Sequence, residues 1–205
     1  MGRRTNPVRH ERLRLQLAHE AARILAEEGE TDFHRAKKKA AARLNVGNKT
    51  VLPTNREIES ALAEHQRLFR GETQTGYILA LRKAAIELMR ELHCFQPRLV
   101  GAVLRGTADS WSAIELHLFA DTPEEIAIFL LDRGIPFQVK EHLWRRKEGT
   151  GTTFTPVYIT EFSGYEVKLY VFPAIGLRNA PLCPIEKRPM RRMDLTQVTR
   201  LIESQ

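Results

Sequence analysis

The sequence predicts an α+β fold, in which an N-terminal helical region is followed by a mixed, largely antiparallel sheet with flanking helices. Apolar residues recur at helical spacing up to residue 95. After Pro97 they form short continuous or alternating runs, which are typical of strands. One further helical stretch interrupts these runs. We therefore divide the 205 residues into a helical, basic region, 1–95, and an α+β region, 96–205.

Four amphipathic helices are expected before residue 96. They cover residues 11–29, 31–47, 53–71 and 75–95. Side-chain oxygens can accept hydrogen bonds from the first free amides of a helix, so Thr31 or Asp32 is expected to cap the second helix and Thr54 or Asn55 the third. We expect Gly71 to end the third helix, because glycine is a weak helix former.

The second region combines strands with two helices. The apolar run 98–106 is expected to be one strand buried on both faces. The segment 121–134 has glutamates in its first turn and a glycine at its end, which favours a helix. The remaining expected strands are 113–120, 135–144, 154–162 and 165–172, and residues 193–204 form the final helix.

The net charge of +7 comes mainly from residues before 96. Lys37, Lys38 and Lys39 form a basic run that can approach the phosphates of a nucleic acid. Contacts to backbone charge carry no base readout, so such binding is expected to be weak, not sequence-specific and sensitive to salt. The alternative is that these lysines form the solvated side of a helix.

Several classes of protein are excluded by composition. No apolar run approaches the length of a membrane span, and the basic first residues lack the apolar core of a secretory signal. We therefore expect a cytoplasmic protein without a membrane partner. Cys94 and Cys183 are far apart and have no CxxC spacing, so both are expected to be free thiols and no structural zinc site is expected.

One stretch of the second region carries a motif. The apolar run leads into Arg105, Gly106 and Thr107, and a short polar connection then reaches Ser112 and a strand that contains Glu115. This order resembles the nucleotidyltransferase superfamily, the fold of polymerase-beta-like and minimal nucleotidyltransferases. The family pattern is a strand, Gly-Ser, a turn, and a strand with two carboxylates one residue apart; the corresponding words here are "RGT" and "SAIEL".

The resemblance covers residues 98–120 directly and extends more loosely to 172. It implies a nucleotidyltransferase-like domain over 96–205. It also implies that a nucleotide or phosphate contacts Arg105, Gly106, Thr107 and Ser112.

The metal motif of the family is incomplete in this chain. Carboxylates at i and i+2 of a strand share a face, and a third from a neighbouring strand completes a cage for divalent ions. The first position holds Ala113 and the second holds Glu115. The resemblance places Lys168 at the third position, with Glu166 as the alternative after a register slip. We therefore expect Glu115 to be a remnant of the catalytic set, paired with the lysine, and no bound metal or cofactor.

Three hypotheses about function follow. The first is a catalytically decayed protein that binds a nucleotide, a nucleic acid or a regulatory ligand. The second is an active nucleotidyltransferase that uses Mg²⁺ with a reduced metal site. The third is a protein-interaction module that uses the helical half, since arginines flank Leu13 and Leu17. Plainer roles also remain for the single residues: Glu115 as an ordinary carboxylate on a sheet face, His117 as a packed or exposed strand histidine, and Gly106 with Thr107 as a turn.

Overall fold

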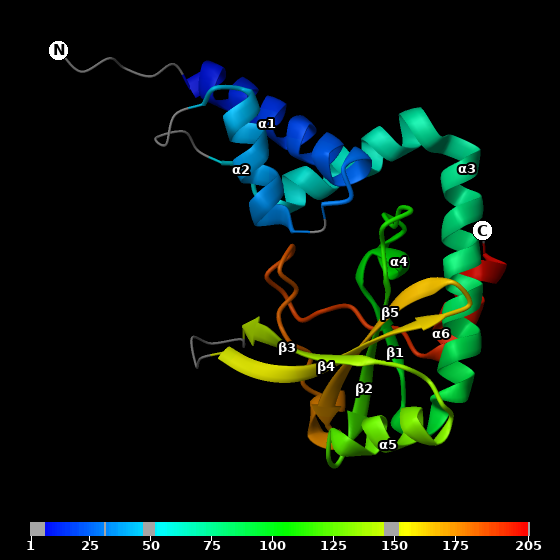
Figure 1. Ribbon diagram of the computed structural model, residues 1–205. Coiled ribbons are helices and arrows are strands. Elements are labelled where there is room, and N and C mark those ends of the chain that lie inside the picture. Colours follow the sequence, from blue (N-terminus) through cyan, green and yellow to red (C-terminus); the bar gives the residue numbers. More distant parts are fainter. Residues whose placement is uncertain (1–6, 31, 47–51, 146–151, 205) are drawn as a thin grey trace. The chain divides into compact units, whose positions relative to one another are not determined.

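The computed structural model describes residues 7–30, 32–46, 52–145 and 152–204 (Figure 1). The chain forms two compact units. Unit 1 comprises Met1–Thr75, Asp109–Trp111 and Pro184–Glu186, and unit 2 comprises Gly76–Ala108, Ser112–Cys183 and Lys187–Gln205. No helix in the described ranges has both the length and the apolar character that crossing a membrane requires.

Unit 1 is built from helices. They are α1 (Pro7–Glu27), α2 (Phe33–Arg43) and the first part of α3 (Asn55–Glu91). Asp32, one of the two residues expected to cap the second helix, is the N-cap of α2. Its carboxylate accepts hydrogen bonds from the amides of His34 and Arg35. Thr31, the other candidate, lies outside the described residues. Thr54 and Glu57 exchange hydrogen bonds in the manner of a capping box at the start of α3.

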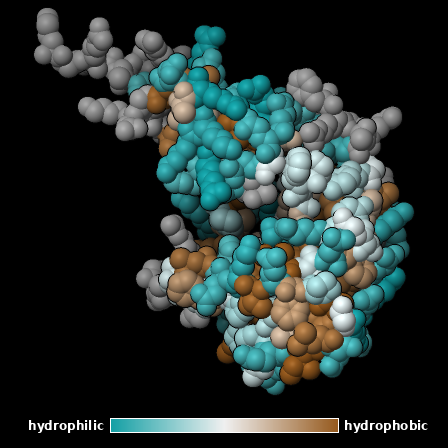
Figure 2. Space-filling view, viewed as in Figure 1, coloured by the Kyte–Doolittle hydropathy of each residue, from teal (hydrophilic) through white to brown (hydrophobic). Residues whose placement is uncertain are grey.

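The core of unit 1 consists of small and aliphatic side chains from the three helices. Leu17, Ala21, Ile24 and Ile58 are fully buried in it, and Leu13 packs against it from the edge. The apolar stripe of α1, which suggested a surface for a partner protein, is therefore used inside the unit. The visible surface of α1 and α2 is mostly hydrophilic (Figure 2).

The expected third and fourth helices are one helix. The prediction that Gly71 ends the third helix was wrong, because α3 runs without a break from Asn55 to Glu91. A glycine inside a helix costs about 1 kcal/mol relative to alanine, which strong helix formers on both sides can offset. The helix then ends before Pro97, as predicted, through the short 3₁₀ turn η1 (His93–Phe95).

Unit 2 contains a mixed five-stranded sheet with the strand order β1-β2-β5-β4-β3. Only β2 and β5 pair in parallel among the described strands, so the predicted α+β class with a largely antiparallel sheet is confirmed. The elements are β1 (Arg98–Val100), α4 (Gly101–Arg105), β2 (Ile114–Ala120), α5 (Glu124–Asp132), β3 (Gln138–Arg145), β4 (Thr152–Phe162), β5 (Tyr165–Pro173), η2 (Ala174–Leu177) and α6 (Leu195–Glu203).

The predicted strand 98–106 was wrong in its second half. The strand ends at Val100, and the chain turns at Gly101, whose φ of +74° is a conformation that other residues rarely adopt, into the short helix α4. Val103 and Leu104 are nevertheless buried in the same core. A continuous apolar run indicates burial but does not separate a strand from a helix.

The two faces of the sheet differ in chemistry. One face carries Leu116 and Leu118 of β2 with Leu169 of β5, and belongs to a core that includes residues of α3, α5 and α6. Hydrophobic surface also gathers over the outer side of α5 (Figure 2), where Ile128 and Leu131 are exposed.

We name the other face of the sheet, opposite to the one that carries Leu116 and Leu118, the polar-aromatic face. It is defined by Glu115, His117, His142, Trp144, Lys168, Tyr170 and Phe172.

Candidate functional site

Glu115 lies in the second position of β2, half-buried, and packs directly over Gly101. A β-carbon added at Gly101 would lie 2.8 Å from Cδ of Glu115 and closer still to its Oε2 atom. Any larger residue at position 101 would therefore displace the carboxyl group. Gly101 has no side chain, and this leaves the space that Glu115 occupies. The sequence analysis did not predict this contact, although an isolated glycine in an apolar run can indicate that another group packs closely against the backbone.

Three groups act on the Glu115 carboxyl. The Tyr170 hydroxyl donates a hydrogen bond of 3.4 Å to Oε1. Burial raises the pKa of Glu115, while the positive charges of Lys168 and Arg105 and the tyrosine hydrogen bond oppose that rise without cancelling it. The same burial, with the charge of Glu115, raises the pKa of Tyr170. Glu115 is therefore less willing to ionise than an ordinary surface glutamate.

Lys168 is the direct neighbour of Glu115 across the parallel pair β2–β5, as predicted. The prediction that Lys168 forms a salt bridge with Glu115 was wrong, because Lys168 pairs with Glu166 instead. Nζ of Lys168 lies 3.0 Å from Oε1 of Glu166, which is two residues earlier on the same strand and so on the same face. Lys168 acts on Glu115 through its charge.

The "RGT" segment, residues 105–107, forms the end of a helix and not the end of a strand. Gly106 adopts the left-handed conformation at the C-cap of α4, and the amides of Gly106 and Thr107 both donate to the carbonyl of Ala102. These two amides are therefore already used within the turn and are not free to donate to the phosphate that the motif predicts at Gly106 and Thr107. Arg105 is the last residue of α4, and Ser112 lies half-buried just before β2.

Arg82 of α3 is a buried cation next to this turn. Its Nε donates to Val103 and its Nη2 to Leu104, both at the carbonyl end of α4. Its Nη1 is buried and has no hydrogen-bond partner among the described residues. Burial lowers the pKa of Arg82, and the positive charge of Arg191 lowers it further. Positive charge thus accumulates at this turn, which a bound anion would relieve.

The carboxylate set of a two-metal site is not present in the part of the chain that the structure describes. No group of three or more His, Cys, Asp or Glu side chains there could hold a metal ion. Ala113, two residues before Glu115, is buried and carries no ligand atom. Cys94 and Cys183 are free thiols, as predicted.

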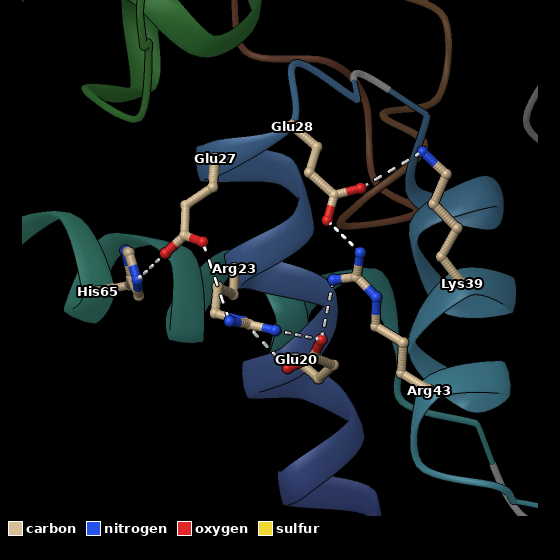
Figure 3. Close-up of polar contacts among 7 residues, drawn as sticks. All are labelled: Glu20, Arg23, Glu27, Glu28, Lys39, Arg43 and His65. Carbon is tan, nitrogen blue, oxygen red and sulfur yellow. Dashed lines mark hydrogen bonds and ion pairs between the residues drawn. The ribbon is translucent and has the colours of Figure 1, made fainter.

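The Lys37–Lys39 run is on α2 in unit 1 and is partly neutralised. Lys39 lies 3.3 Å from Glu30. It also lies 3.7 Å from Glu28, which in turn pairs with Arg43 (Figure 3). Lys38 is exposed. A nucleic-acid surface at this run stays a prediction, with less uncompensated charge than the sequence implied.

A denser ionic network covers the same side of unit 1. The carboxylate of Glu20 lies between Arg23 at 2.9 Å and Arg43 at 3.1 Å (Figure 3). The hydrogen bond from Arg23 is the main cause that lowers the pKa of Glu20. Glu27 continues the network to His65 at 3.5 Å. These charges satisfy one another, so the network has a clear structural role.

No family model, curated protein or solved structure matches this chain. The relationship to the nucleotidyltransferase superfamily therefore rests on the motif over residues 98–120 and stays a prediction.

The raised pKa of Glu115 leads to a test of stability against pH. A carboxyl group that holds its proton more tightly in the folded chain destabilises that chain when it ionises. The loss of stability is absent when the pH is below the pKa of Glu115 in the unfolded chain. It develops as the pH rises above that value and through the pKa of Glu115 in the folded chain. Relative to the unmodified protein, Glu115→Gln should therefore have a Tm that increases between about pH 4 and about pH 8. A thermal-melting series over this range checks the sign, and Glu141→Gln, at an exposed carboxylate of β3, is the matched control.

Proposed function

We propose that this chain is a nucleotidyltransferase-like protein that binds a nucleotide without transferring the nucleotidyl group. The observation that carries the proposal is the direct pairing of Glu115 with Lys168 on adjacent parallel strands. The position that would hold a metal-binding carboxylate in an active relative holds an ammonium group. A lysine there supplies the positive charge that divalent ions supply in a metal-dependent enzyme, but it does not activate an attacking oxygen.

Binding is supported by the balance of charge around this position. Lys168 and Arg105 both act on Glu115. The buried cation Arg82, on which the charge of Arg191 also acts, binds the carbonyls at the end of α4. A triphosphate bears several negative charges and accepts hydrogen bonds from such groups. The chemistry of the ligand is thus anionic, and a nucleotide is the class that the motif resemblance favours.

The test is a thermal-shift and calorimetric panel of nucleoside triphosphates, each with Mg²⁺, with Mn²⁺ and with EDTA. The expected result is stabilisation that does not need the metal, of about 2–3 kcal/mol at ligand concentrations near 100 times Kd, without release of pyrophosphate. Lys168→Met should weaken the binding. Lys140→Met, which changes an exposed lysine on β3, two strands away from β5, should not.

The outcomes separate the three hypotheses. Metal-dependent release of pyrophosphate would establish the active-enzyme alternative. Stabilisation by single-stranded oligonucleotides but not by nucleotides would show that the ligand of this site is a nucleic acid. No shift with either class of ligand would sink the binding proposal.

A further inference from the structure

The polar-aromatic face contains a cluster of buried hydrogen-bond donors that the proposed function does not use. His117 lies at its centre and is fully buried. The Trp144 ring lies 5.4 Å from the His117 ring between centroids, and Nε of Arg192 lies 3.0 Å from Nδ1 of His117. Three nitrogen atoms of this cluster are buried without a hydrogen-bond partner among the described residues: Nε2 of His117, Nε1 of Trp144 and Nη2 of Arg192.

The hydrogen bond from Arg192 determines the tautomer of His117. A guanidinium group has only donors, so Nδ1 of His117 must accept and carries no proton. Burial keeps the pKa of His117 well below its usual value, and the charges of Arg192 and His142 lower it further. The imidazole is therefore neutral, with its proton on Nε2. That atom is a donor, as are the indole nitrogen of Trp144 and the remaining nitrogen of Arg192.

Arg192 brings a positive charge into this cluster. Its Nη1 donates to the Gly176 carbonyl at 2.7 Å, and its guanidinium lies 5.2 Å from the Phe119 ring and 5.4 Å from the Phe172 ring. None of the described carboxylates forms an ion pair with it. Burial, together with Arg98, lowers its pKa to about 10. It remains charged at neutral pH.

Within the described residues, the cluster thus lacks hydrogen-bond acceptors and a negative charge that would balance Arg192. Leaving a buried donor unsatisfied costs about 1–3 kcal/mol, and more for a charged group, so three such donors on His117 and two side chains beside it represent a large penalty for a purely structural arrangement. Aromatic rings from Tyr170 and Phe172 surround the same imidazole at 5.6 and 4.6 Å, which restricts the size of a group that can enter.

We propose that His117, Trp144 and Arg192 form a binding site for a small oxyanion, the carboxylate or phosphate group of a compact ligand. An oxyanion offers only acceptors and matches the charge of the guanidinium, and hydrogen bonds to charged groups are the stronger ones. The site contains none of the residues Glu115, Lys168 or Arg82. It therefore goes beyond the proposed nucleotide binding and stands or falls separately.

The indole proton of Trp144 reports directly on this site. The chain has two tryptophans, and Trp111 is 61% exposed, so Trp111→Phe leaves one indole signal, that of Trp144. Proton–nitrogen NMR spectra of the full-length Trp111→Phe protein are recorded during titration with sodium acetate and with sodium phosphate, against sodium chloride at equal ionic strength. The expected result is a saturable downfield movement of this signal with at least one oxyanion and none with chloride.

Variants test whether the arginine supplies the charge. Arg192→Gln should weaken the oxyanion at least about tenfold, which corresponds to the loss of one charged hydrogen bond. Arg133→Gln is the matched control, since Arg133 also stacks on a phenyl ring, that of Phe129, but lies on the exposed end of α5. It should change the affinity less than about twofold.

Each outcome decides the matter. Saturation by acetate alone assigns a carboxylate ligand, and saturation by phosphate alone assigns a phosphate ligand. An indole signal that no oxyanion moves, or an equal loss of affinity in the two arginine variants, overturns the proposal. The nucleotide panel measures thermal stability with triphosphates, whereas this titration follows the Trp144 indole with acetate and phosphate, so failure of the nucleotide proposal and failure of this one are distinguishable.

Discussion

Gly101→Ala is expected to destabilise the protein by ~3 kcal/mol, which lowers Tm by roughly 6–12 °C in a chain of this size. Two effects contribute. Alanine in the left-handed conformation, at a φ of +74°, costs about 1–2 kcal/mol. In addition, the new methyl group would overlap the Glu115 carboxyl, which must then leave its place and its hydrogen bond to Tyr170. Thermal unfolding followed by circular dichroism measures the change.

Gly134 provides the control for the first effect. Its φ is +64°, close to that of Gly101, but no atom lies within 4 Å of an added β-carbon. Gly134→Ala should therefore lower the free energy of unfolding only by the cost of placing alanine in the left-handed conformation, about 1 kcal/mol. Glu115→Ala introduced together with Gly101→Ala should restore much of the stability, because it removes the overlapping group. Equal destabilisation by the two glycine variants would contradict the close packing of Glu115 on Gly101.

Ala113→Asp combined with Lys168→Asp is expected to create a divalent metal site. The two changes add carboxylates on either side of Glu115, one two residues before it and one directly across the parallel strand pair. Carboxylates at these three positions would supply the oxygen ligands that Mg²⁺ and Mn²⁺ prefer. Calorimetry should detect Mn²⁺ bound at least about tenfold more tightly than by the unmodified protein, a difference of ~1.4 kcal/mol.

The corresponding pair of asparagine substitutions keeps the size of the new side chains and removes their charge. It should bind the ion no better than the unmodified chain, and adding Glu115→Gln to the aspartate pair should abolish the gain. Far-ultraviolet circular dichroism verifies that each variant is folded. If the unmodified protein itself binds two divalent ions at micromolar affinity, the decayed-enzyme proposal fails; a folded aspartate pair that binds no ion shows that the three positions do not form a cage.

The sequence predicted the sheet and its chemistry better than the details of its turns. Alternation in 113–120 placed Glu115 and His117 on one face, and strand order brought Lys168 beside Glu115, because period-two patterning is strongly tied to burial. The turn at Gly101 was not predictable from an apolar run that suits a strand and a buried helix equally. The error at Gly71 arose in the same way, since a local preference of about 1 kcal/mol yields to its surroundings.

The candidate sites were harder to predict because their contacts join distant residues. Arg192 reaches His117 from a segment far along the chain and also donates to the Gly176 carbonyl, and nothing in its own neighbourhood marks it. Arg82 likewise looks like any other charged residue of a helix, yet it is buried against two carbonyls of α4. Hydrogen-bond satisfaction of buried groups depends on tertiary structure, which a linear pattern does not encode.

The continuous helix α3 has a consequence for how the protein unfolds. Its residues up to Thr75 belong to unit 1 and those from Gly76 onward to unit 2, so the two hydrophobic cores share one hydrogen-bonded element instead of a loose linker. Helix formation is cooperative, and an end exposed within a long helix leaves several backbone groups unpaired. Melting of one core therefore removes the packing from the part of α3 that belongs to that unit. A cleavage between residues 75 and 76 would create two new helix ends, each with backbone groups that lack their hydrogen-bond partners.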